Sequence, residues 1–278
     1  FFQAEDGIRD CLLSRGLGDV YKRQAAMFVT GSDAINRFWI YRGNQWEQRE
    51  SLTRGLKDVT SHQDGEDGGV RLRDLDGDGI CEIIVGRKDS SAVYQLGESG
   101  WRKLPFSLPQ HFPIVTRTGG DAGLRFTDLD DDGLQDLIFS NGTRYGTRML
   151  ESLAKGWTRV GIEGVREGDG VGEQHSRKPE VIPPIVRKDG TNNGAWLKRG
   201  HLYWQNEDTG AIFPHHIDLR SFSDLLGKQA TQPRSPASSL HMMEVHEGLR
   251  VELVAAEPLV MDPVDLAWGP DGRLWVAE

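Results

Sequence analysis

The sequence predicts an all-β protein built from repeated antiparallel sheets of four short strands. Three observations predict this class: an acidic loop occurs twice, residues of alternating polarity precede each loop, and a tryptophan recurs at nearly the same spacing. Glycine supplies 34 of the 278 residues, about 12% against a usual value of about 7%, which favours many turns. The chain is therefore expected to form a series of similar sheets.

The acidic loop is the most informative feature. Residues 74–82 read Asp-Leu-Asp-Gly-Asp-Gly-Ile-Cys-Glu (the first acidic loop), and 54 positions later residues 128–136 read Asp-Leu-Asp-Asp-Asp-Gly-Leu-Gln-Asp (the second acidic loop). Carboxylates at positions 1, 3, 5 and 9 of a tight turn repel one another unless a hard cation lies among them, and Ca²⁺ with about six to eight oxygen ligands fits best. Glycine at position 6 lets the backbone turn, and the main-chain carbonyl at position 7 completes the set. The predicted ligands are Asp74, Asp76, Asp78, Ile80 and Glu82 in the first acidic loop and Asp128, Asp130, Asp132, Leu134 and Asp136 in the second.

The flanking residues predict strands rather than helices. An EF-hand needs a bidentate Glu at position 12 and a helix on each side, whereas position 12 is Val85 in the first acidic loop and Phe139 in the second. Residues 70–73 and 124–127 alternate in polarity, and an apolar run follows each loop. Each loop is therefore expected to join two strands of a hairpin. An acidic turn that stays solvated and binds no metal is the alternative.

At these residues the sequence resembles the FG-GAP or VCBS repeat family, whose repeats are blades of integrin-α-like β-propellers with Ca²⁺ held in Asp-x-Asp-x-Asp-Gly-x-x-Asp loops. The resemblance implies a partial β-propeller over residues 25–227 with two Ca²⁺ sites. Glu82 departs from the family pattern, which usually has Asp at that position. Its longer side chain is expected to weaken the first site rather than remove it.

Residues 1–24 resemble a translated sequencing adapter of the kind found in metagenomic assemblies, and we expect them to be an artefact that is disordered or irregular. A genuine irregular N-terminal arm is the alternative. By the repeat spacing, an acidic loop of an earlier unit would fall at about residues 19–27, so the first blade is expected to be cut. Its remaining part begins with Phe28-Val29-Thr30-Gly31, which aligns with Ile83-Ile84-Val85-Gly86.

Tryptophans 46, 101 and 157 recur at intervals of 55 and 56 residues, as expected for units of four strands and one loop. A third loop of the same outline, residues 189–194, has Thr and Asn in place of the acids and is not predicted to bind Ca²⁺. Residues 195–206 combine aromatic, amide and imidazole groups. They form either the aromatic core of a closing blade, which we favour, or a rim that stacks on a sugar. His215 and His216 are expected to be structural or solvent-facing, because neighbours on a strand point opposite ways.

The C-terminal part is expected to begin a second domain. Residues 218–227 predict a short helix capped by Ser221 and ended by Gly227, and residues 228–240 predict a linker. In residues 241–278 we expect a strand at 249–254, followed by a hairpin at 264–276. The stretch 248–278 resembles the opening of large membrane-bound dehydrogenases of planctomycetes and verrucomicrobia, which are similar to glucose/sorbosone dehydrogenases. This resemblance implies a truncated second propeller, with quinone and haem c in a part that lies past residue 278.

Composition excludes several functions. The formal net charge is −9, and the two acidic loops hold nine acids, so the rest of the chain is neutral. Nucleic acid is therefore not an expected partner. The nine acids are Asp74, Asp76, Asp78, Glu82, Asp128, Asp130, Asp131, Asp132 and Asp136. No apolar run of about eighteen residues predicts a transmembrane segment. The two cysteines form no metal or redox motif, and no catalytic constellation is present.

These features favour a calcium-binding, non-catalytic propeller that acts as a binding or structural module of a larger exported protein. Its expected partners are a carbohydrate or a protein, and an extracytoplasmic location is expected because Ca²⁺ is plentiful there. One alternative is a fragment of a quinone-dependent sugar or alcohol dehydrogenase. The other is an adhesive structural propeller without a small ligand.

Overall fold

The computed structural model describes residues 26–30, 35–42, 44–63, 65–87, 89–166, 182–206, 217–227, 236, 239, 243, 246, 248–256, 259–261 and 263–277. The predictions for residues 1–24, for His215 and His216 and for most of the linker fall outside this part of the chain.

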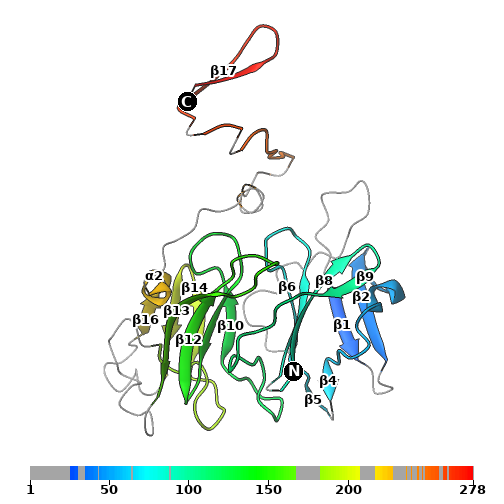
Figure 1. Cartoon of the computed structure of the whole chain (residues 1–278), viewed down its shortest axis with the longest axis vertical. Coiled ribbons are helices and arrows are strands. Elements are labelled where there is room, and N and C mark those ends of the chain that lie inside the picture. Colours follow the sequence, from blue (N-terminus) through cyan, green and yellow to red (C-terminus); the bar gives the residue numbers. More distant parts are fainter. Residues whose placement is uncertain are drawn as a thin grey trace.

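Four antiparallel sheets follow one another along the chain (Figure 1). The first sheet contains β1 (Ala26–Thr30), β2 (Asn36–Arg42) and β3 (Gln45–Gln48). The second contains β6 (Val70–Arg73), β7 (Glu82–Gly86), β8 (Ser91–Gly97) and β9 (Gly100–Lys103). The third contains β10 (Leu124–Thr127), β11 (Asp136–Ser140), β12 (Arg144–Met149) and β13 (Arg159–Val165). The fourth contains β14 (Ala195–Lys198), β15 (His201–Trp204) and β16 (Asp218–Ser221).

Few other elements occur in the described residues. The short helix η1 (Glu50–Thr53) and the small hairpin of β4 (His62–Gln63) and β5 (Glu66–Asp67) lie between the first and second sheets in the sequence. One α-helix, α2 (Phe222–Leu226), follows the fourth sheet. The described part is therefore nearly all β and propeller-like, which confirms the predicted fold class.

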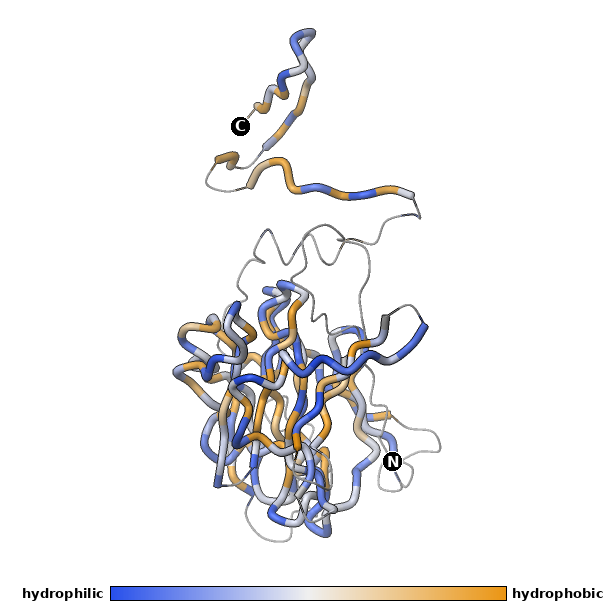
Figure 2. Tube along the Cα trace, turned by 90° about the vertical axis from the view of Figure 1, so that its right-hand side faces the viewer, coloured by the Kyte–Doolittle hydropathy of each residue, from blue (hydrophilic) through white to orange (hydrophobic). Residues whose placement is uncertain are grey.

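The second strand of each four-stranded sheet is buried on both faces, which explains its continuous apolar sequence. In β7, Ile84 packs in the cluster shared with the third sheet, while Ile83 and Val85 pack in the cluster shared with the first. In β11, Ile138 packs toward the fourth sheet and Phe139 toward the second. The sheets therefore stack face to face, and Figure 2 shows hydrophobic stretches running through the body that they form.

Strand pairing corrects the alignment predicted for the first sheet. Thr30 pairs with Asn36 at the end of β1, which is the place that Gly86 holds opposite Ser91 in the second sheet. Thr30 therefore corresponds to Gly86 rather than to Val85. Because a shift of one residue reverses the face of a strand, Phe28 rather than Val29 packs against the cluster shared with the second sheet.

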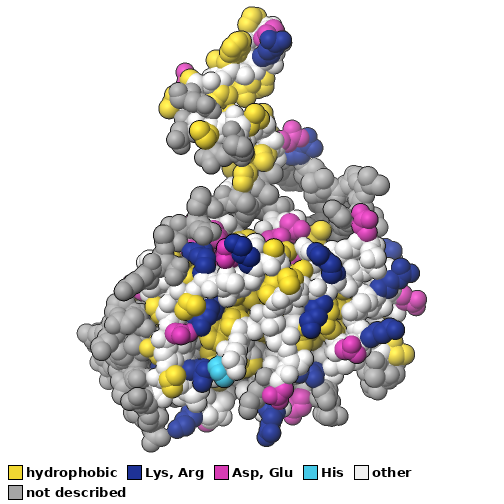
Figure 3. Space-filling model, in the orientation of Figure 1, with side chains coloured by type: hydrophobic (Ala, Val, Ile, Leu, Met, Phe, Trp, Pro, Cys, Tyr) yellow, Lys and Arg dark blue, Asp and Glu magenta, His cyan; other side chains and the backbone are white. Residues whose placement is uncertain are grey.

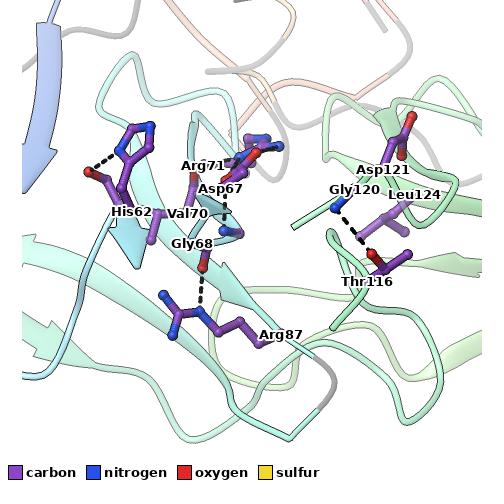
Figure 4. Close-up of polar contacts among 12 residues, drawn as sticks. His62, Asp67, Gly68, Val70, Arg71, Arg87, Thr116, Gly120, Asp121 and Leu124 are labelled. Atoms are coloured by element: carbon purple, nitrogen blue, oxygen red, sulfur yellow. Dashed lines mark hydrogen bonds and ion pairs between the residues drawn. The ribbon is translucent and has the colours of Figure 1, made fainter. Parts of the chain in front are cut away.

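A glycine turn leads into the first strand of the second and third sheets. Asp67 accepts the Gly69 N–H at 2.7 Å and forms an ion pair with Arg71 at 2.7 Å, as Figure 4 shows for the Asp67 and Arg71 side chains. In the third sheet, Asp121 accepts the Gly123 N–H at 2.8 Å and pairs with Arg125 at 2.8 Å. Glycine is required at residue 123, because its φ is +95° and a Cβ would lie 2.3 Å from the Ser140 carbonyl oxygen.

The helix predicted near the end of the fourth sheet is shorter than expected. Residues 218–221 form β16, and only Phe222–Leu226 are helical. Ser221 is the predicted cap: its hydroxyl accepts the Asp224 N–H at 3.2 Å, and Asp224 accepts the Ser221 N–H in return. Gly227 ends the helix with a φ of +66°, as predicted.

The C-terminal hairpin is present, while the strand predicted before it is not. β17 (Asp265–Trp268) pairs with β18 (Leu274–Ala277) and lies apart from the four sheets in Figure 1. Residues 249–254 are described without strand pairing, and Val254 is 74% exposed. Alternation of polarity therefore predicted a strand that finds no partner among the described residues. In that same part of the chain, no helix is long and apolar enough to cross a membrane.

Candidate metal centre

The first acidic loop gathers three carboxylates. Ligand atoms of Asp74, Asp76 and Asp78 lie within 4.8 Å of one another. Asp74 shapes the turn, because its two oxygens accept the N–H groups of Gly77 and Gly79, each at 2.9 Å. The loop joins β6 to β7, so the predicted hairpin is confirmed.

The second acidic loop has the same plan between β10 and β11. Asp128 accepts the Asp132 N–H at 3.1 Å and the Gly133 N–H at 2.8 Å. Here the three ligand atoms within 4.8 Å of one another come from Asp128, Asp130 and Asp136. Two acidic groups therefore lie at the same point of adjacent sheets, one from positions 1, 3 and 5 of its loop and the other from positions 1, 3 and 9.

Position 9 carries a buried carboxyl group in both loops. Glu82 accepts the Leu75 N–H at 3.0 Å. Asp136 accepts two N–H groups, from Leu129 at 2.9 Å and from Leu150 at 2.8 Å. Each of these acids therefore closes its own loop by binding the amide at position 2.

Two predicted side-chain ligands lie outside these close groups. Asp132 accepts the Leu134 N–H at 2.8 Å. Glu82 has a side chain one methylene longer than that of Asp136, the residue at the same position of the second acidic loop. Asp132 and Glu82, and the carbonyl groups of Ile80 and Leu134, therefore remain predicted ligands.

Burial and mutual repulsion disfavour charge on these acids. Burial, together with the charges of Asp76, Asp78 and Asp74, raises the pKa of Glu82 to about 9. Burial likewise raises the pKa of Asp136 to about 8. Burial and neighbouring aspartates also raise the pKa of Asp76 to about 6 and of Asp132 to about 6. A divalent cation among these groups would reverse the effect, because it attracts their charged forms.

Two buried oxygens support the same conclusion. Glu82 Oε1 and Asp130 Oδ1 are buried and lack a hydrogen-bond partner among the described residues, and Glu82 and Asp130 are 0% and 1% exposed. A buried acceptor without a partner is costly, whereas oxygen atoms of this kind are the ligands that Ca²⁺ prefers. The donor set therefore fits a hard cation, and the three aspartates gathered in each loop could hold it.

Sequence reasoning missed Arg159 in β13. Its guanidinium donates to Asp130 Oδ2 at 2.8 Å, and the two side chains are 13% and 0% exposed. The only sequence signal is that Arg159 and Lys103 each stand two residues after a repeated tryptophan. Arg159 of β13 thus brings a positive charge to the second acidic loop.

We expect a divalent cation to stabilise the protein more as pH rises. Below about pH 4 these acids are protonated in both the folded and the unfolded protein, so their burial does not destabilise the metal-free fold. As pH rises through about 6 to 9, the folded protein must hold them charged, and the metal-free fold loses stability. Cation binding becomes stronger over the same range, because protons compete less. Thermal unfolding with Ca²⁺ and with a chelator at about pH 5, 7 and 9 should show a widening gap in Tm. A gap that is the same at all three pH values would contradict this assignment.

The aromatic stretch of the fourth sheet divides between its two faces. Trp204 is 1% exposed and donates its indole N–H to the Pro184 carbonyl at 3.0 Å, so it belongs to the core. On the opposite face, Trp196 pairs across strands with Tyr203, and their rings stack at 5.3 Å with an interplanar angle of 10°. The core interpretation therefore holds for Trp204, and Trp196 and Tyr203 are half-buried on the other face.

Comparisons with known families agree with the repeat. Residues 74–139 match the model of the FG-GAP-like repeat, a span that runs from position 1 of the first acidic loop into β11 and includes the second. Residues 235–278 match a domain of unknown function (DUF7133), whose description carries no activity. No curated protein matches the chain.

Proposed function

We propose that this chain is a calcium-binding, non-catalytic β-propeller module of a larger exported protein. The single observation that carries the proposal is the pair of acidic groups, each with ligand atoms within 4.8 Å of one another, on adjacent sheets of an FG-GAP-like repeat. The acids that remain predicted ligands, Glu82 and Asp132, belong to the same proposal, as do the carbonyl groups of Ile80 and Leu134. Bound Ca²⁺ would supply positive charge that turns repulsion between carboxylates into attraction, so its role is to stabilise the loops.

The proposed partner is a carbohydrate or a protein, and the proposed location is outside the cytoplasm. Loops of this kind suit the millimolar Ca²⁺ supply of that environment. On the face drawn in Figure 3, basic and acidic side chains are scattered over the body. The half-buried pair Trp196 and Tyr203 is the aromatic feature that would suit stacking on a sugar ring. The dehydrogenase alternative rests only on the C-terminal resemblance, and the domain matched there has no described activity.

Calcium titration of the purified chain tests the proposal. We expect two Ca²⁺ ions per chain and a Tm that falls by roughly 10 to 20 °C on chelation, because a ligand at about 100 times its Kd contributes about 2.7 kcal/mol at each of the two sites. Replacing Asp128, whose oxygens organise the second acidic loop, should remove one of the two ions. The measurements are isothermal titration calorimetry and thermal unfolding of the original chain and of Asp128→Ala.

Asp189→Ala provides the matched control. Asp189 is an exposed acid that accepts hydrogen bonds from Thr191. Strand pairing corrects the third loop predicted at residues 189–194: these residues form the turn before β14, matching the turn at Asp121, and do not join the first two strands of the sheet as the acidic loops do. This variant should bind two ions and keep the full Tm response. A chain whose Tm ignores both Ca²⁺ and chelator would refute the proposed function.

A further inference from the structure

The two acidic loops touch each other through a backbone hydrogen bond. The Gln135 N–H, at position 8 of the second acidic loop, donates to the Leu75 carbonyl, at position 2 of the first, at 2.9 Å. The side chains beside this bond share one core: Leu75 is 0% exposed, and Leu134 packs against the same cluster. The loops of neighbouring sheets are therefore one connected unit.

This bond connects the predicted ligands of one loop to those of the other. The peptide group that supplies the Gln135 N–H also carries the Leu134 carbonyl, a predicted ligand of the second loop. On the other side, Leu75 donates its own N–H to Glu82, which closes the first loop. A cation bound to the Leu134 carbonyl would polarise that peptide group and make the Gln135 N–H a better donor to the Leu75 carbonyl.

Electrostatic repulsion between two bound ions does not oppose this link. Each loop holds acids at positions 1, 3, 5 and 9, so a divalent ion leaves neither loop with a net positive charge. The corresponding leucine of the second acidic loop, Leu129, packs in a different cluster, between the third and fourth sheets. Leu75 is thus the position 2 residue placed to transmit a change from one loop to the other.

We propose that the two acidic loops bind Ca²⁺ with positive cooperativity, transmitted by the contact between the Leu75 carbonyl and the Gln135 N–H. This inference rests on the proposed function. When Ca²⁺ binds to either loop, it holds the shared hydrogen bond and the Leu75 side chain in place. The other loop therefore loses less conformational entropy when it binds its own ion. By linkage, the gain in affinity is equal in both directions.

Calcium titrations of full chains with one loop disabled test the proposal. Asp76→Asn with Asp78→Asn disables the first loop while amide oxygens can still accept the local turn bonds, and Asp128→Asn with Asp132→Asn disables the second. We expect the remaining loop to bind Ca²⁺ roughly fivefold or more weakly than it does in the original chain with the other loop loaded, by the same factor in both variants. Affinities that do not change, or that change by unequal factors, overturn the proposal.

Leucine variants locate the transmission. Leu75→Ala should reduce the coupling factor, whereas Leu129→Ala, which also truncates a buried leucine at position 2, should preserve it; equal losses overturn the assigned route. Hydrogen exchange needs no truncation and covers the case in which Leu75→Ala does not fold. In the Asp128→Asn, Asp132→Asn variant, Ca²⁺ in the first loop should slow exchange of the Gln135 amide, and an unchanged rate overturns the proposal. A chain that binds two ions independently refutes only this inference, whereas one that binds none refutes the proposed function as well.

Discussion

Replacing Asp136 by alanine is expected to lower the free energy of unfolding by roughly 3 to 5 kcal/mol in calcium-free buffer. The Asp136 side chain is fully buried and accepts two backbone N–H groups, from Leu129 and Leu150. Each orphaned buried donor costs about 1 to 3 kcal/mol. Urea unfolding of the purified variant measures the loss.

Asp136→Asn is the informative comparison. Its amide oxygen can accept one of the two N–H groups, so the loss should be about half as large, while one carboxylate of the second acidic loop is still removed. A loss below about 1 kcal/mol for Asp136→Ala would show that neither hydrogen bond matters to stability. It would also remove the reason for placing an acid at position 9 of the loop.

Arg159→Met is expected to lower the free energy of unfolding by roughly 3 to 5 kcal/mol without calcium, and by much less with it. The substitution removes the guanidinium that pairs with buried Asp130 and keeps most of the apolar volume. Breaking one side of a buried ion pair leaves an uncompensated charge, which is the main cost. A cation in the second acidic loop would supply the missing positive charge. Calcium-dependent stabilisation should therefore be larger in the variant than in the original chain, as measured by urea unfolding with and without Ca²⁺.

Lys103→Met controls for the loss of charge alone. Lys103 holds the corresponding place in the second sheet, two residues after Trp101, and is exposed. Its replacement should change stability by less than about 0.5 kcal/mol in either buffer. Equal destabilisation by Arg159→Met with and without calcium would mean that Ca²⁺ does not enter the loop that contains Asp130.

The acids of the candidate site could be predicted because their spacing within one short loop decides where they point. Asp74 and Asp128 occupy matching places for that reason. Arg159 could not be predicted, because it lies 29 positions after Asp130 in the sequence. The two residues come together only when β13 pairs with β12. The contact between Leu75 and Gln135 depends in the same way on how two sheets stack.

The errors of sequence reasoning have a related cause. Alternation of polarity predicted a strand at residues 249–254, but a strand needs a neighbour to accept its hydrogen bonds, and no pairing is described there. The misaligned first sheet arose because similar apolar residues fit either register, and only the pairing of Thr30 with Asn36 decides between them.

The glycine turns before the second, third and fourth sheets show which of their interactions is indispensable. The turn before the fourth sheet has Asn192 and Trp196 where the earlier turns have an Asp and an Arg, yet the Asn192 side chain still accepts the Gly194 N–H at 2.7 Å. A neutral amide thus reproduces the bend that a carboxylate makes elsewhere. The bend consequently needs an acceptor oxygen at the first position and no charge at either, so the ion pair can be lost by mutation while the path of the main chain is inherited intact.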